Sequence, residues 1–373
     1  MQKIALIAPY SWTAISSPLI NSIICFSKIG YQIDLYAPKS TFFENKGVDS
    51  SILDKVNYVE LPKNFTPSLK NKLKFRILGG ETNFYEFVDF AKTKEYKLII
   101  GYDQIGVCYA HALSQKTNTP YIFHSLEIEK KEKVTKYSRK AVKKALFSIS
   151  QDTARAEILS KLYNTQIKSF KILYNSSIRH FSSSKSSFFQ DKFNVHNKEV
   201  ILACGTLSED HLANKFNLIV ENLNENQVLI AHGWCPEKKH EEELIKLKHQ
   251  YPNKFFYSDS LLPFDKKHDI FKSASVSLVL FSTSNDNLKY ATGSAGKLYD
   301  SIQYNTPVVA LNLPGAKKLI EKNNIGFIAN SLEDIPLKCE KVIKNINSSK
   351  LESAHNVFEF ENCFKNVFSN YYL

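Results

Sequence analysis

Short apolar runs of strand length alternate with amphipathic stretches of helix length along most of this chain. The pattern begins with KIALIAP at 3–9, continues with SPLINSIICFSKIG at 17–30 and returns to a strand with YQIDLYAP at 31–38. Strands that alternate with covering helices predict a parallel, doubly wound α/β sheet, because helices on both faces bury the strands.

The alternation occurs twice, on either side of a Ser-, Lys- and Asn-rich stretch without a clear period. A chain of 373 residues also exceeds what one core usually holds. We therefore predict two tandem Rossmann-like domains whose strand ends face a shared crevice. The expected parts are a first domain at 1–175, a linker at 176–197, a second domain at 198–350, and a C-terminal helix at 351–373 that crosses toward the first domain.

Composition and motifs exclude several classes of protein. The six cysteines are spread singly, without the spacing of a zinc site, and no apolar run reaches the roughly 18 residues of a membrane-spanning helix. The start of the chain lacks the apolar core of a signal peptide, so we expect a cytoplasmic protein. The formal net charge is +12, but the basic residues do not interleave with a stacking motif, which disfavours nucleic acid as a partner. An NAD site is disfavoured because LIAPYSWTA lacks the G-x-G-x-x-G pattern.

The glycine-rich stretch ATGSAG lies between the expected strand VSLVLF and the expected helix GKLYDSIQYN. A helix start presents backbone N–H groups and the positive end of the helix dipole, which attract anions. Gly293 and Gly296 let a ligand approach the backbone. Ser294 can add a hydroxyl donor, Lys297 can supply charge to a diphosphate, and Asp300 can accept hydrogen bonds from a ribose. The alternative is a plain turn in which Ser294 caps the helix and Lys297 is solvated.

The sequence from this loop onward, GSAGKLYDSIQYNTPVVALNLPGAKKLIEKNNIGFIA, resembles the nucleotide-sugar half of GT-B glycosyltransferases, particularly family 4 and its relatives. Upstream, ILACGTLSEDHLANKFNLIV resembles the first strand and helix of the same half, and PYIFHSLEI and ISQDTARAEIL resemble parts of the acceptor half. The likeness covers nearly the whole chain. It implies the GT-B fold and transfer of a sugar from a nucleoside diphosphate.

The family's pattern of two glutamates separated by seven residues is altered here. Asp300 takes the second position, which contacts the donor ribose in the family, and Thr292 takes the first. Gly205 and Thr206 end the first strand of the second domain, where Thr206 replaces the family's arginine and Lys215 stands for its lysine. We hypothesise that Lys297 compensates by taking the charge of the diphosphate.

In the first domain, the sequence FHSLE places His124 and Glu127 just past a strand. In the resembling enzymes a histidine near here contacts the donor sugar or positions the acceptor, so these two are the candidate catalytic residues. The alternatives are a strand-end histidine bonded to backbone and an acid favoured by a helix start. Asp103 ends another strand and is either a crevice residue or the N-cap of the next helix.

The resemblance implies a metal-independent glycosyltransferase of bacterial surface polysaccharide biosynthesis that needs no separate cofactor. UDP-sugar is favoured over GDP-sugar as the donor, retention over inversion, and the acceptor would be a glycan or a lipid-linked glycan. Two alternatives stay open. One is a nucleotide-sugar 2-epimerase of the same fold, with His232 as a candidate base. The other is a catalytically inactive partner subunit, which the replacement of the first acid by Thr292 favours.

The segment FTPSLKNKLKFRILGG at 65–80 combines four basic residues with apolar residues at helical spacing. A surface helix packed on the domain core is the alternative. A basic residue close to an anionic leaflet adds roughly 1 kcal/mol. Together with a long basic helix expected at 130–144, the segment predicts peripheral contact with the inner face of the cytoplasmic membrane.

Overall fold

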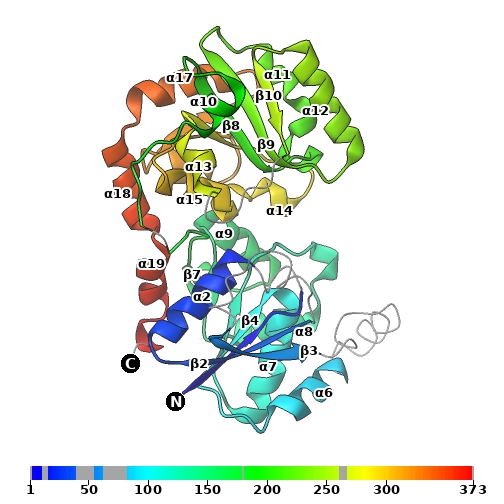
Figure 1. Cartoon of the computed structure of the whole chain (residues 1–373). Coiled ribbons are helices and arrows are strands. Elements are labelled where there is room, and N and C mark those ends of the chain that lie inside the picture. Colours follow the sequence, from blue (N-terminus) through cyan, green and yellow to red (C-terminus); the bar gives the residue numbers. More distant parts are fainter. Residues whose placement is uncertain are drawn as a thin grey trace. The chain divides into compact units, whose positions relative to one another are not determined.

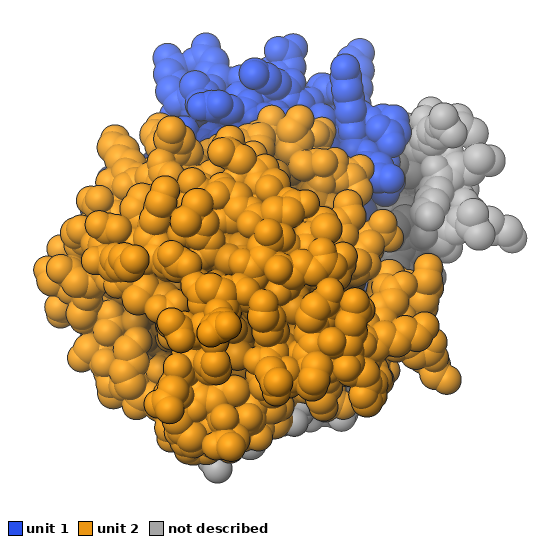
Figure 2. Space-filling view, turned by 90° about the horizontal axis from the view of Figure 1, so that it is seen from above, with its two compact units in different colours: residues 1–174, 360–373 blue, residues 175–359 orange. Residues whose placement is uncertain are grey.

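The computed structural model describes residues 2–10, 16–38, 54–61, 82–178, 180–259 and 267–371. The chain divides into two compact units, Met1–Tyr174 with Phe360–Leu373, and Asn175–Glu359, which Figure 2 colours separately. The predicted linker at 176–197 belongs to the second unit, where it contains the helix α10 (Phe188–Phe193). The predicted membrane segment at 65–80 lies outside the described residues.

The described strands of the first unit form one parallel sheet in the order β3-β2-β1-β4-β5-β6-β7 (Figure 1). They are β1 (Lys3–Ile7), β2 (Gln32–Pro38), β3 (Val56–Leu61), β4 (Leu98–Tyr102), β5 (Tyr121–His124), β6 (Ser148–Ser150) and β7 (Phe170–Ile172). Every residue of β4 and β5 is buried, because helices cover both faces of the sheet. The strand order reverses between β1 and β4, and sheets of this kind bind ligands beyond the carboxyl ends of such strands.

The described helices of the first unit are α2 (Ser17–Lys28), α6 (Thr82–Ala91), α7 (Asp103–Thr117), α8 (Lys136–Lys144), α9 (Thr153–Leu162) and α19 (Phe360–Val367). The basic helix expected at 130–144 is shorter than predicted, because α8 begins only at Lys136. Thr135 and Ser138 form a capping box in which each backbone N–H donates to the other's hydroxyl at 3.0 Å. This cap fixes the start of the helix.

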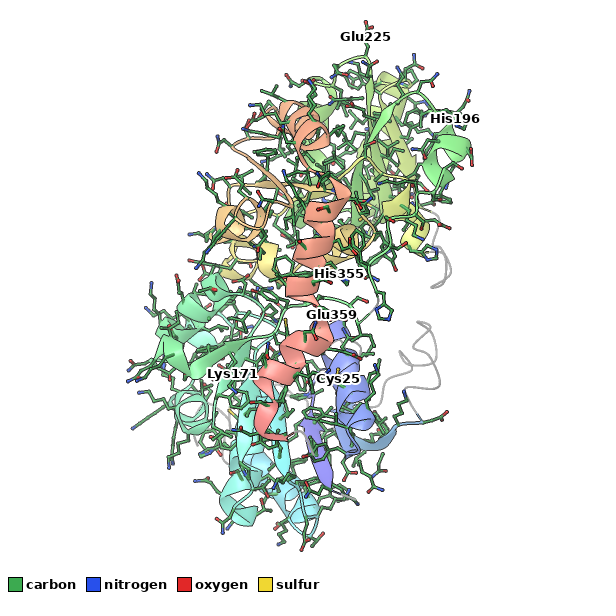
Figure 3. The ribbon with its side chains drawn as sticks, turned by 90° about the vertical axis from the view of Figure 1, so that its left-hand side faces the viewer. Cys25, Lys171, His196, Glu225, His355 and Glu359 are labelled. Carbon is green, nitrogen blue, oxygen red and sulfur yellow. The ribbon has the colours of Figure 1, made fainter. Side chains whose placement is uncertain are left out.

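The single helix predicted at 351–373 is divided in the structure: α18 (Ser348–Phe358) belongs to the second unit, and the C-terminal helix α19 packs within the first unit. The Phe26 ring on α2 meets Phe364 with ring centroids 4.7 Å apart and Phe368 at 4.9 Å, both edge to face. Lys171 on β7 donates to the carbonyl of Val367 at 2.7 Å. In Figure 3, Cys25 on α2 and Lys171 lie on either side of α19. Aromatic contacts therefore hold a segment that is far away in sequence.

Asp34 in the middle of β2 is a buried carboxylate that three side chains satisfy. Tyr96 donates to it at 2.6 Å, Asn57 at 2.9 Å and Lys94 at 3.1 Å, while only 1% of its surface is exposed. Burial alone would raise the pKa of Asp34, but the hydrogen bonds from Tyr96, Asn57 and Lys94 outweigh it and lower the pKa. The charged form therefore joins β2 to β3 and to the segment before β4.

We expect Asp34→Ala to lower the free energy of unfolding by about 2 to 3 kcal/mol, since it leaves buried donors without an acceptor. A carboxylate whose pKa is lower in the folded state contributes its whole stabilisation above the unfolded-state pKa. That contribution disappears as the pH falls through the folded-state pKa. The difference in free energy of unfolding between parent and variant should thus be largest at pH 7 and shrink below about pH 4. Denaturant unfolding at both pH values measures this difference.

Asp89→Asn is the control, because Asp89 forms an exposed ion pair with Lys92. A deficit that does not depend on pH would contradict the account.

The described strands of the second unit form a parallel sheet in the order β10-β9-β8-β11-β12-β13. They are β8 (Glu199–Thr206), β9 (Gln227–Trp234), β10 (Phe255–Ser258), β11 (Val276–Val279), β12 (Val308–Leu311) and β13 (Gly326–Ala329). Alternate residues of β8 enter opposite cores: Ile201 and Ala203 lie in one, Leu202 and Cys204 in the other. The predicted fold class, two tandem Rossmann-like domains, is confirmed.

Besides α10, the second unit has eight described helices, several of which are labelled in Figure 1. They are α11 (Asn217–Val220), α12 (Lys238–Gln250), α13 (Lys267–Lys272), α14 (Asp286–Lys289), α15 (Gly296–Gln303), α16 (Ala316–Ile320), α17 (Ile335–Asn345) and α18 (Ser348–Phe358). The helix α14 was not predicted. It interrupts the connection between β11 and α15, where Asn285 caps its start by accepting from the N–H of Leu288 at 3.1 Å.

Candidate functional site

Lys297 and Gly205, which the sequence predicted as site residues from separate segments, lie together at the carboxyl end of β8. A Cβ placed on Gly205 would stand 3.6 Å from the Lys297 ammonium. Gly205 has a φ of +106°, in the region that favours glycine, and its surface is exposed. The ammonium of Lys297 therefore lies against bare, accessible backbone.

The Lys297 side chain extends over the ring of Phe281, with its ammonium 5.7 Å from the ring centroid. No ion pair of this lysine with an acidic group is present among the described residues. Burial lowers the pKa of Lys297, and the nearby Cys204 offsets part of that shift. A partly desolvated ammonium gains from an anion, because the anion replaces the lost solvation.

The start of α15 adds backbone donors to the same region. Ala295 is the N-cap residue and supplies no side-chain cap. A Cβ placed on Gly296 would meet nothing within 4 Å, so space lies open beside the first turn of the helix. An open helix start with a neighbouring ammonium has the chemistry of a phosphate-binding site.

Gly293 and Ser294 shape the loop before the helix. The Ser294 hydroxyl donates to the carbonyl of Ala291 at 3.0 Å, and Asn175 donates to the carbonyl of Ser294 at 2.7 Å. The Tyr299 hydroxyl donates to the carbonyl of Gly293 at 2.7 Å. The hydroxyl that was expected to donate to an anion is therefore used within the loop.

The other residues of this unit that the sequence singled out differ in their burial and in their contacts. Asp300 is half-buried and lies one turn beyond Lys297 on α15. Thr206 is half-buried and pairs in register with Trp234 of β9. Lys215 ends a 3-10 turn, where its side chain is exposed and makes no hydrogen bond or ion pair with the described residues. Thr292 is buried, and its hydroxyl oxygen has no hydrogen-bond partner among the described residues.

His211 belongs to this region and was missed from the sequence. Its Nδ1 lies 3.0 Å from the Ser208 hydroxyl, and its ring lies 5.3 Å from that of Phe281. Burial lowers the pKa of His211 to about 4, with a smaller contribution from the charge of Lys297. The imidazole is therefore neutral near pH 7. The only sequence signal was its place in the loop that also contains Lys215.

In the first unit, His124 ends β5 and is 1% exposed. Burial lowers its pKa to about 3, so the ring is neutral at physiological pH. The ring lies 4.9 Å from that of Tyr102, and its Nε2 has no hydrogen-bond partner among the described residues. Glu127, three residues later, has an exposed side chain.

The described residues contain no group of three or more His, Cys, Asp or Glu side chains placed to hold a metal ion. None of their helices has both the length and the apolar character needed to cross a membrane.

Comparison with known proteins finds likeness in structure alone. No family model matches the chain, and no curated protein matches it in sequence. HepE from Anabaena, solved in complex with UDP, superposes with a TM-score of 0.73 at 14% identity, over 100% of this chain and 99% of HepE. The chain has the GT-B fold.

Two further solved structures share this fold over nearly their whole length. The lipopolysaccharide outer core galactosyltransferase WaaB superposes with a TM-score of 0.67 at 14% identity, over 99% of this chain and 100% of WaaB. Sucrose-phosphate synthase from Thermosynechococcus elongatus superposes with a TM-score of 0.69 at 12% identity, over 100% of this chain and 98% of the synthase. HepE was also solved with UDP-glucose. The GT-B fold expected from the sequence motifs is confirmed.

Proposed function

We propose that this GT-B protein is a glycosyltransferase that moves a sugar from a UDP-sugar to a hydroxyl group of a glycan or lipid-linked glycan. The observation that carries the proposal is the Lys297 ammonium beside the exposed backbone of Gly205, next to the open helix start at Gly296. The complexes of HepE with UDP and UDP-glucose support UDP as the nucleotide. WaaB, a lipopolysaccharide galactosyltransferase, supports a role in surface polysaccharide biosynthesis.

In the proposed reaction, the bond between the sugar C1 and the diphosphate oxygen breaks, and UDP leaves with the electron pair. The acceptor oxygen bonds to C1, and its proton passes to the departing diphosphate oxygen. Lys297 and the N–H groups at the start of α15 stabilise the charge that develops on the diphosphate. Asp300 binds the ribose, while His124 and Glu127 serve the transfer step. Because Lys297 supplies the positive charge, we propose a metal-independent reaction that a chelator leaves unchanged. The resemblance to family 4 supports retention of configuration at C1.

Incubation with UDP-, GDP-, CMP- and dTDP-sugars tests this function. We expect release of UDP from a UDP-sugar, accelerated by a glycan or lipid-linked glycan acceptor. Release of free epimerised sugar without an acceptor would instead identify an epimerase. Absence of both products with every donor and acceptor would favour a catalytically inactive partner subunit.

We also propose that the first unit contacts anionic membrane. On α8 the side chains of Lys136, Lys140, Lys143 and Lys144 are exposed, and Leu146 just beyond it is 60% exposed. Binding of the parent to vesicles that contain anionic lipid should weaken as the salt concentration rises. A variant with Lys140, Lys143 and Lys144 changed to Gln should bind these vesicles more weakly than the parent. Equal, salt-insensitive retention of both would refute the contact and leave the transferase proposal intact.

A further inference from the structure

Side chains from the ends of neighbouring strands and from helix α9 hold the turn after β5, residues 125–127, together with one bond inside the turn. Asp103 accepts the N–H of Leu126 at 2.7 Å and that of Glu127 at 2.9 Å through one oxygen, Oδ1. Arg155 donates to the carbonyl of Leu126 at 2.8 Å. Gln151 also donates to the carbonyl of Ser125 at 2.7 Å, the Ser125 hydroxyl donates to the carbonyl of Glu127 at 2.9 Å, and the Ser125 N–H donates to the carbonyl of Ile149 at 3.0 Å.

Asp103 was expected either as a crevice residue or as the N-cap of the next helix, and it is not the N-cap. Tyr102 occupies that position without a side-chain cap, and Asp103 begins α7. Its backbone has a φ of +54°, a left-handed conformation that is uncommon outside glycine. This conformation accompanies a carboxylate that reaches from the end of β4 to the turn after β5.

This way of holding a turn is energetically costly. Asp103 is 5% exposed and Arg155 is 1% exposed, and removing charged groups from water costs several kcal/mol per ion. A left-handed non-glycine residue adds about 1 kcal/mol or more. Backbone bonds or a glycine could close a short turn without buried charges. Strain and buried charge at the carboxyl end of a parallel sheet are typical of a site that must keep one geometry.

We propose that Asp103 is a positioning residue that fixes the turn between His124 and Glu127, and with it the placement of both side chains for sugar transfer. The inference rests on the proposed function, because it assigns a task to these two residues. A misplacement of about 1 Å can lower turnover about 100-fold without changing the groups that react. Asp103 acts through its Oδ1 acceptor, and Arg155 holds the opposite side of the turn.

An amide at position 103 separates this role from a chemical one. Burial raises the pKa of Asp103 to about 7, although the two N–H donors of the turn oppose that shift. Near neutral pH the carboxyl is therefore partly neutral and partly charged, and an amide of the same shape supplies the neutral form alone. Asp103→Asn keeps an oxygen for both N–H groups, whereas Asp103→Ala leaves them without an acceptor.

The test compares these two variants of the full-length protein by turnover, by the KM for the donor, by thermal unfolding and by hydrogen exchange of the turn amides. Asp103→Ala should lower turnover about 100-fold with the donor KM within about threefold, and the Leu126 and Glu127 amides should exchange faster. Asp103→Asn should restore turnover to within about fivefold of the parent and restore protection. The control is Tyr31→Phe, which removes the hydrogen bond from Tyr31, just before β2, to the carbonyl of Tyr371. It should lower stability and leave turnover within about twofold.

Three results would overturn the inference. The first is a folded Asp103→Ala variant whose turnover stays within about twofold of the parent. The second is an Asp103→Asn variant as slow as Asp103→Ala, because the charge of Asp103, and not its acceptor oxygen, would then be required. If the parent itself transfers no sugar, the proposed function fails and exchange alone decides this inference. Unchanged protection of Leu126 and Glu127 in Asp103→Ala would then refute it.

Discussion

Replacement of Lys297 by Met is expected to weaken UDP binding about 10- to 100-fold. The change removes a charge-assisted hydrogen bond to the diphosphate, which contributes about 1.5 to 3 kcal/mol. Methionine keeps the side-chain stem over Phe281, so the packing that orients this position is largely preserved. Isothermal titration of the parent and the variant with UDP gives both affinities.

The pH dependence of the same titration identifies the group. Burial lowers the pKa of Lys297 in the free protein, and a bound diphosphate raises it again because it favours the charged form. UDP affinity should therefore fall as the pH rises through the free-state pKa, and this dependence should vanish in Lys297→Met. Lys289→Met is the matched control, because Lys289 ends the neighbouring helix α14 with an exposed side chain. Equal loss of affinity in both variants would mean that only general charge attraction is at work.

Replacement of His124 by Ala is expected to lower turnover about 100-fold while the affinity for UDP stays within about twofold, since we assign His124 to the transfer step. Its pKa of about 3 keeps the ring neutral from pH 5 to 8. The turnover of the parent should therefore show no ionisation from this residue in that range. Steady-state kinetics across this pH range measures both quantities.

A buried histidine elsewhere in the first unit supplies the control. His111 on α7 lies 3.1 Å through its Nδ1 from the Tyr121 hydroxyl, and burial lowers its pKa to about 4. His111→Ala should destabilise the protein without lowering turnover below about half that of the parent. If His124→Ala keeps the turnover of the parent, His124 is a structural histidine at the end of β5.

The fold could be predicted because burial on both faces leaves a clear record in the sequence. The run ILAC in β8 and the run LII in β4 are apolar without alternation, which is typical of central parallel strands. The start of α8 was misplaced because Thr135 and Ser138 cap the helix inside a stretch that is rich in lysine on both sides of the cap. The helix α14 was missed because its four residues carry no periodic signal.

The candidate site was predictable only in part, for a similar reason. The sequence predicted Gly296 from its place beside a helix start and Gly205 from its place at the end of a strand. It could not predict that the Lys297 ammonium lies beside Gly205, because that depends on how the side chain extends over Phe281. The hydroxyl of Ser294 is turned to Ala291 by the shape of the loop. His211 is held near Lys297 by contacts with Ser208 and Phe281, which no spacing in the sequence predicts.

The central claim is that the second unit binds the nucleotide of a UDP-sugar at Lys297, Gly205 and the start of α15. Isothermal titration of the purified full-length chain with UDP tests it most directly. The account predicts one site per chain with a dissociation constant between about 1 µM and 1 mM, the usual range for enzyme substrates. It also predicts weaker binding of GDP, and marked loss of UDP binding in Lys297→Met but not in Lys289→Met. No saturable binding of UDP at millimolar concentration, or undiminished binding by Lys297→Met, would contradict it.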